Sequence, residues 1–258
     1  MAGLSTSGSA SPRPFPPPAR RRIPLIGLLF IVGLLLSGNV ALLYESWRHQ
    51  RALTALRLDP LAMGGASSAQ DFTKADLMIL GDSHAAGWGL TGLGTHVANL
   101  GVSGHTSAQV LYRCELLLSE TQANCILVFA GGNDAKAAGF QPERIHAIAQ
   151  DCISNLKEAR DFLAPRCRRL VFCTIPPLFR QPASWYLMNR EACFEARQII
   201  NEGLREFQGD HVEVLDAWEI FSARGDLPSL SSDGVHMNAA GYALLEARLR
   251  ELLRVAPR

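Results

Sequence analysis

Short, almost uniformly apolar runs alternate along most of this chain with longer segments in which apolar residues recur at helical spacing. The runs predict five strands, at residues 77–80, 96–102, 125–130, 170–175 and 212–215. The periodic segments predict helices at residues 106–119, 142–163, 189–207 and 239–253. Strands that are apolar throughout are typical of parallel sheets covered on both faces. We therefore expect residues 71–258 to form one α/β domain with a central parallel sheet.

The hydrophobic pattern near the N-terminus is different. Residues 23–44 carry no charged side chain, and as a helix they would span about 33 Å, enough to cross a hydrocarbon core of about 30 Å. Four arginines precede this run and no acidic residue does. By the positive-inside rule, this predicts a single-pass helix in the inner (plasma) membrane with a cytoplasmic N-terminus. The domain that follows is then periplasmic or extracellular.

We interpret the apolar run as an uncleaved signal anchor. It exceeds the apolar region of about 7–15 residues found in cleaved signal peptides, and no clear small-x-small site follows it. A cleaved signal peptide is the alternative interpretation. The Ser-, Gly- and Pro-rich residues 1–22 predict a disordered basic tail. Residues 45–70 predict a linker, with a charged helical continuation to Leu58 followed by small residues.

Composition narrows the possible partners. The formal net charge of +1 gives no indication of nucleic-acid binding. All six cysteines follow the apolar run and none forms a Cys-x-x-Cys pair, which favours disulfides in an oxidising compartment over a zinc site. Fifteen pairings are open for three bridges. The preferred local pairs are Cys114 with Cys125 and Cys152 with Cys167, whereas Cys173, inside an apolar strand, is a candidate for a buried thiol.

Residues suited to acyl transfer follow the predicted strands. They are Ser83, Gly101 and Asn133 at or just after the ends of the first three strands, and Asp233 and His236 near the C-terminus. In open α/β sheets, functional sites lie beyond the carboxyl ends of the strands. A serine nucleophile needs a base, the base needs an acid that orients it, and the oxyanion needs donors. Each residue alone also fits an ordinary turn, so the hypothesis depends on their combination.

These motifs resemble the SGNH hydrolase superfamily, also called the GDSL esterase/lipase family. The similarity covers about residues 75–254 and rests on four blocks: Gly81-Asp82-Ser83-His84, Asn99-Leu100-Gly101, Gly131-Gly132-Asn133-Asp134 and Asp233-Gly234-Val235-His236. The resemblance implies a flavodoxin-like three-layer α/β/α fold. It also implies esterase, lipase, thioesterase or deacetylase activity without a cofactor or metal.

The resemblance further implies a role for each site residue. Ser83 would be the nucleophile, His236 the base and Asp233 the residue that orients the base. The oxyanion hole would consist of the Ser83 and Gly101 backbone N–H groups and the Asn133 side chain. His84 is a departure, because the family often has leucine there.

We therefore expect a membrane-anchored, extracytoplasmic serine ester hydrolase that acts through an acyl-enzyme on a small-molecule or glycan ester. The alternatives are an O-acyltransferase acting on an envelope polysaccharide with the same residues and, less favoured, a catalytically inactive glycan-binding module. Gly139-Phe140 and the connection at residues 178–188, with Trp185 and Tyr186, are expected to border the site. The pattern leaves the acyl-chain length, the oligomeric state and the choice between hydrolase and acyltransferase open.

Overall fold

The computed structural model describes residues 25–61, 75–89, 96–119, 122–180 and 188–254. The chain divides into two compact units, residues 1–54 and 55–258. Most of helix α1 (Leu25–Leu58) belongs to the first unit. It is 34 residues long, none of them buried, and by length and composition it is apolar enough to cross a membrane. It includes the charged continuation predicted from the sequence and ends just before Asp59-Pro60, because proline disfavours a helical conformation in the residue before it.

The second unit is built on a five-stranded, entirely parallel sheet, which confirms the predicted fold class. Its strands are β1 (Leu77–Gly81), β2 (Val97–Asn99), β3 (Ala123–Phe129), β4 (Cys167–Cys173) and β5 (Val212–Leu215), in the order β2-β1-β3-β4-β5. Strand order reverses between β1 and β3, and in such sheets ligands bind at the carboxyl ends beside this point. Strand β2 is shorter than predicted, although the backbone N–H groups of Leu100 and Val102 still donate to the Ile79 and Gly81 carbonyls of β1.

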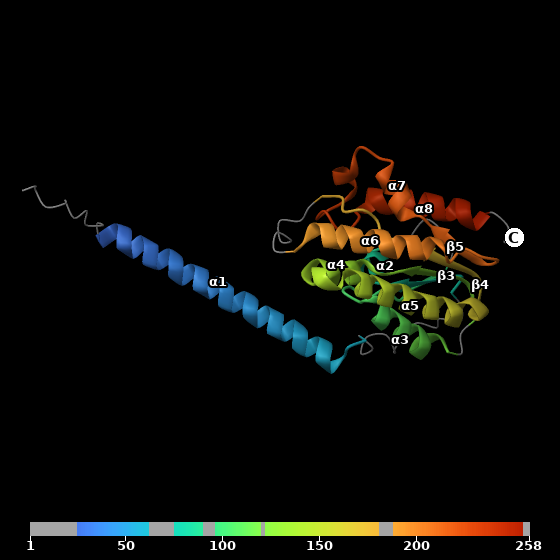
Figure 1. Cartoon of the computed structure of the whole chain (residues 1–258), viewed down its shortest axis with the longest axis horizontal. Helices are drawn as coiled ribbons and strands as arrows, with labels where there is room; N and C mark the ends of the chain where they lie inside the picture. Colours follow the sequence, from blue (N-terminus) through green and yellow to red (C-terminus); the bar gives the residue numbers. More distant parts are fainter. Residues whose placement is uncertain (1–24, 62–74, 90–95, 120–121, 181–187, 255–258) are drawn as a thin grey trace, which may run out of the picture. The chain divides into compact units, whose positions relative to one another are not determined.

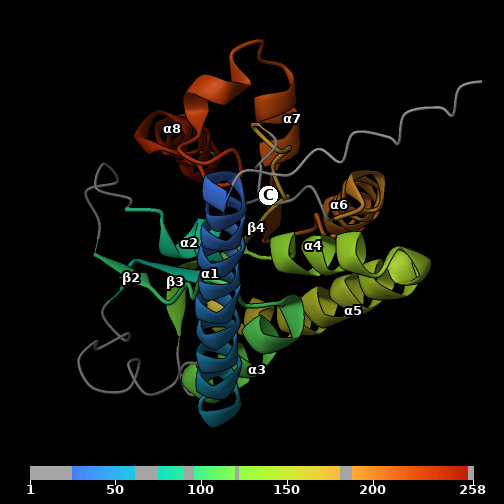
Figure 2. The same ribbon diagram turned by 90° about the vertical axis from the view of Figure 1, so that its left-hand side faces the viewer.

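Helices cover both faces of the sheet (Figures 1 and 2). One face packs against α3 (Ser107–Leu118), α4 (Gly132–Phe140), α5 (Ile145–Leu163) and α6 (Arg190–Arg205). The other packs against α2 (Ser83–Ala86), α7 (Ala217–Ser222) and α8 (Ala239–Arg254). Alternate side chains of β1 pack into the two cores: those of Met78 and Leu80 on the first face of the sheet, and those of Leu77 and Ile79 on the second. Burying each such side chain contributes about 1.5–3 kcal/mol.

The predicted disulfides are wrong: all six cysteines lie among the described residues, and all six are free thiols. Cys114 on α3 and Cys125 on β3 belong to core clusters on opposite faces of the sheet, so the sheet separates them. Cys152 lies beside Gly131, after the carboxyl end of β3, whereas Cys167 begins β4 at the opposite edge. The interpretation of Cys173 as a buried thiol is confirmed.

The chain that follows α1 is bonded to helix α3. Gln109 Nε2 donates to the Pro60 carbonyl at 2.6 Å, and Arg113 Nη1 donates to the Leu61 carbonyl at 2.7 Å. Both carbonyls belong to the same compact unit as the sheet. The first residues of the predicted linker region after Leu58 are therefore held by the domain.

Candidate active site

The candidate nucleophile lies in a sharp turn after β1. Gly81 has φ 144°, and a Cβ atom there would lie 1.9 Å from the Phe129 carbonyl oxygen, so this approach of β1 to β3 requires glycine. Asp82 then caps α2 by accepting a 2.9 Å hydrogen bond from the His84 backbone N–H. Ser83 is thereby the first residue of α2, at the carboxyl edge of the sheet.

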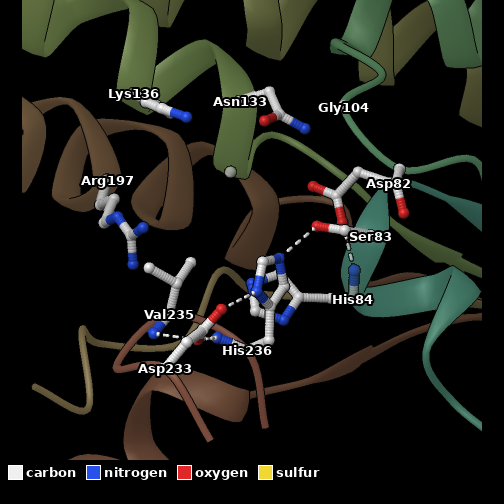
Figure 3. A pocket seen from close by; sticks show the side chains of 12 residues that line it. Asp82, Ser83, His84, Gly104, Asn133, Lys136, Arg197, Asp233, Val235 and His236 are labelled. Carbon is white, nitrogen blue, oxygen red and sulfur yellow. Dashed lines mark hydrogen bonds and ion pairs between the residues drawn. The ribbon is translucent and has the colours of Figure 1, made fainter. Parts of the chain in front are cut away.

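A cavity of about 370 Å³ opens at this edge (Figure 3). The turn after β1, the loop after β2, the start of α4, helix α6 and the loop before α8 all contribute to its wall. Its lining residues are Asp82, Ser83, His84, Ser103, Gly104, Gly132, Asn133, Lys136, Arg197, Asp233, Val235 and His236. The structure thus brings four of the five sequence-predicted site residues into one cavity.

Ser83, His236 and Asp233 form a continuous hydrogen-bonded chain (Figure 3). His236 Nε2 lies 2.9 Å from Ser83 Oγ, and His236 Nδ1 lies 2.7 Å from Asp233 Oδ2. With its proton on Nδ1, the imidazole donates to the carboxylate and accepts from the serine hydroxyl. This is the arrangement in which a histidine removes a proton from a serine.

Asp233 is held as an anion that also shapes its own loop. Burial opposes ionisation, but hydrogen bonds from the His236 imidazole and from the backbone N–H groups of His236 and Val235 lower the pKa of Asp233 to about 2. The two backbone bonds are 2.8 and 2.9 Å long. The carboxylate therefore fixes both the loop and the tautomer of the ring.

The short helix α2 is held from outside by two side chains. Asn99 Nδ2 donates to the carbonyls of Ala85 at 2.8 Å and Trp88 at 3.1 Å. Tyr242 on α8 donates its hydroxyl to the His84 carbonyl at 3.0 Å. These bonds satisfy carbonyls at the end of the helix and restrict movement of the serine it carries.

Asn133 lies at the cavity wall at the start of α4. Its Nδ2 donates to the His105 carbonyl at 2.9 Å, and an amide nitrogen carries a second N–H. The next residue, Asp134, accepts bonds from the Ser107 N–H and hydroxyl at 2.9 and 2.7 Å. The starts of α3 and α4 are therefore tied together, which holds Asn133 in the wall of the cavity that Ser83 lines.

Gly101 is the predicted site residue that the structure does not bring into the cavity. Its N–H donates to Asn99 Oδ1 at 2.9 Å. A Cβ atom there would lie 2.3 Å from the Ala86 nitrogen, so this glycine permits close packing of the β2 loop against α2. Gly104, with φ 85°, lines the cavity instead. In the sequence, the Ser103-Gly104 pair shortly before the capping residue Thr106 is the feature that could have indicated Gly104 as the glycine of the site.

Two buried ionisable groups flank Ser83. Burial, only partly offset by the hydrogen bond from the His84 backbone, raises the pKa of Asp82 to about 7. Burial, together with the positive charge of Arg197, lowers the pKa of His84 to about 3. His84 stacks on Phe129 with ring centroids 5.1 Å apart. The second imidazole near the site is thus a neutral packing group.

The described residues among the others expected at the border of the site do not line the cavity. Gly139 is buried and packs close to Met188, and Phe140 is exposed; neither lines the cavity. Trp185 and Tyr186 lie outside the described residues. Conversely, sequence reasoning missed Lys136 and Arg197. Lys136 follows Asn133 by one helical turn, which was a usable signal, whereas nothing in the local sequence of α6 marks Arg197.

Residues 79–244, more than half of the chain, match the model of the GDSL-like Lipase/Acylhydrolase family. Thioesterase 1/protease 1/lysophospholipase L1 of Escherichia coli K12 is 34% identical over 96 residues, which cover 32% of this chain and 46% of that protein. The chain thus spans about half the length of this curated relative.

Solved structures share the fold. A GDSL-like lipase from Bacteroides thetaiotaomicron superimposes with a TM-score of 0.55 at 19% identity, covering 76% of this chain and 96% of the other. Axe2, an acetylxylan esterase from Geobacillus stearothermophilus, gives a TM-score of 0.52 at 19% identity, covering 70% and 94%. With the family match over residues 79–244, the chain belongs to the GDSL-like lipase/acylhydrolase family.

Proposed function

We propose that the protein is a serine ester hydrolase that acts through an acyl-enzyme on Ser83. The observation that carries this proposal is the hydrogen-bonded chain from Ser83 through His236 to Asp233 at the wall of a cavity. Membership of an acylhydrolase family supports the same reaction class. The three side chains take the roles of nucleophile, base and orienting acid.

The proposed reaction uses these contacts. His236 Nε2 takes the proton from Ser83 Oγ as the oxygen attacks the ester carbonyl carbon. The resulting oxyanion accepts hydrogen bonds from the Asn133 amide and from the backbone N–H groups of Ser83 and Gly104. His236 then protonates the leaving alcohol, and an acyl-enzyme remains. A water molecule, deprotonated by the same imidazole, attacks this ester and releases the acid and the free serine.

Water is the proposed acyl acceptor, and this separates the hydrolase from an O-acyltransferase. With p-nitrophenyl acetate as donor, we expect p-nitrophenol and free acetate to appear in equal amounts, because each acyl-enzyme is hydrolysed. Adding a deacetylated polysaccharide such as xylan should leave this ratio at one. Both products are measurable in a single time course, by absorbance and by enzymatic acetate assay. Acetate recovered on the polymer, with a matching deficit in solution, would identify a transferase.

We also propose that α1 anchors the enzyme in the inner (plasma) membrane, with the domain on the extracytoplasmic side. Its length, its apolar composition and the four arginines before it support this orientation. The free thiols remove disulfides as an argument for an oxidising compartment. We expect the membrane fraction to contain the full chain with its original N-terminus, as determined by terminal sequencing. A mature N-terminus near residues 40–50 would instead identify a cleaved signal peptide.

A further inference from the structure

A buried arginine forms part of the cavity wall. Arg197 on α6 is 2% exposed, and its Nη1 donates to the Pro176 carbonyl at 2.6 Å. Its Nε has no hydrogen-bond partner. Within the described part of the chain, no carboxylate forms an ion pair with this guanidinium. A cation is thus buried in the wall of the cavity that holds the candidate nucleophile, and the described residues place no counter-ion against it.

Burying an unpaired charge is costly, and arginine cannot relieve the cost by losing its proton. The carboxylates that line the cavity are engaged elsewhere: Asp233 binds His236, and Asp82 accepts from the His84 backbone. A guanidinium has five N–H donors in a planar fork that matches a carboxylate or a phosphate. A ligand that supplied such a group would satisfy donors that the protein leaves unused.

A second cation lies on the same wall. Lys136 is one helical turn beyond Asn133 on α4, and it too lines the cavity. Figure 3 shows the Arg197 and Lys136 side chains on the same side of the cavity, across from Ser83. The cavity has a volume of about 370 Å³, so one small ligand can present an ester to Ser83 and an anionic group to Arg197.

We propose that Arg197, supported by Lys136, binds an anionic oxygen group of the substrate, so that the enzyme selects esters bearing a carboxylate or phosphate close to the scissile bond. The inference rests on the proposed hydrolase function and specifies its substrate class. Arg197 acts on binding and orientation, whereas the bond-forming and bond-breaking steps remain with Ser83 and His236.

The test compares charged and neutral esters with the full chain. The monoester of adipic acid with p-nitrophenol, against p-nitrophenyl heptanoate, places a carboxylate on the acyl side. The acetyl ester of glycerol phosphate, against acetylglycerol, places a phosphate on the alcohol side. We expect kcat/KM to favour the charged member of at least one pair by about tenfold or more. The pair that shows the preference identifies which part of the substrate carries the anion.

Variants then assign the preference to Arg197. Arg197→Gln is expected to lower the charged-to-neutral ratio about tenfold or more, and Arg197→Lys, which keeps charge but loses the fork, to lower it less. Lys136→Met should reduce the ratio by a smaller factor. The matched control is Arg168→Gln, which removes the same charge from an exposed position near the amino end of β4 and should leave the ratio unchanged.

Each ratio is measured within one protein sample, so a loss of folded protein cancels. If Arg197→Gln yields no folded protein, inhibition of the natural enzyme is measured instead. Glycerol phosphate must then inhibit ester hydrolysis at least tenfold more strongly than glycerol, or adipate at least tenfold more strongly than hexanol. Equal rates for both ester pairs in the natural enzyme, or an unchanged ratio in Arg197→Gln, would overturn the inference. Neither result touches the hydrolase proposal, which fails separately if Ser83 is dispensable for both kinds of ester.

Discussion

Replacement of Ser83 by alanine is expected to lower kcat/KM for a short p-nitrophenyl ester by about 10⁴-fold or more. The Ser83 hydroxyl oxygen lies 2.9 Å from His236 Nε2, and no acyl-enzyme can form without it. The methyl group that remains leaves the cap of α2 intact, because that bond joins Asp82 to His84. The loss is therefore expected in a folded protein, as shown by an unchanged circular dichroism spectrum and melting temperature.

Ser103 provides the matched control for this experiment. It lines the same cavity, but the structure gives it no hydrogen bond to His236. Ser103→Ala should retain activity within about tenfold and still react with a fluorophosphonate probe, whereas Ser83→Ala should not be labelled. Turnover at a natural rate in Ser83→Ala, or labelling of that variant, would reject the assignment of the nucleophile.

The sheet and its helices were predictable because their signal is local. Uniformly apolar runs such as 125–130 are buried on both faces of the sheet, and the strands coincide with these runs to within a few residues. Ser83 and Asn133 come shortly after the ends of β1 and β3, so their positions could be predicted from the same apolar runs. His236 and Asp233 lie three residues apart and bond to each other, so their pairing was also local.

Other features depend on contacts that the one-dimensional pattern does not contain. Gly101 ends an apolar run as a site glycine would, but its packing against α2 and its bond to Asn99 appear only in three dimensions. The cysteine spacing likewise says nothing of the sheet between Cys114 and Cys125. The sequence does not distinguish Arg197 from the other arginines of the predicted helices. Only the packing of α6 places it in the cavity wall.

His236, in the loop before α8, is the proposed base, and His236→Gln is expected to lower kcat/KM about 10⁴-fold. Glutamine retains much of the volume and polarity, but its amide cannot take a proton from Ser83. His146→Gln is the matched control, because the His146 side chain on α5 is 84% exposed and does not line the cavity. That variant should behave as the natural enzyme in the p-nitrophenyl ester assay.

The pH profile separates a base from a residue that only maintains structure. In the natural enzyme the rate should fall as pH falls, because a protonated imidazole no longer accepts the serine proton. Asp233 does not account for this limb: hydrogen bonds from His236 and the loop backbone, acting against burial, lower its pKa to about 2, so it stays ionised over the assay range. Burial also raises the pKa of Asp82 to about 7, so this neighbour of Ser83 titrates in the same range. His236→Gln should lose the part of the acid limb that Asp82→Asn keeps. A natural enzyme whose rate is flat on acidification, or a limb that persists unchanged in the double variant His236→Gln with Asp82→Asn, would exclude this imidazole as the base and leave the 2.9 Å contact with Ser83 as packing alone.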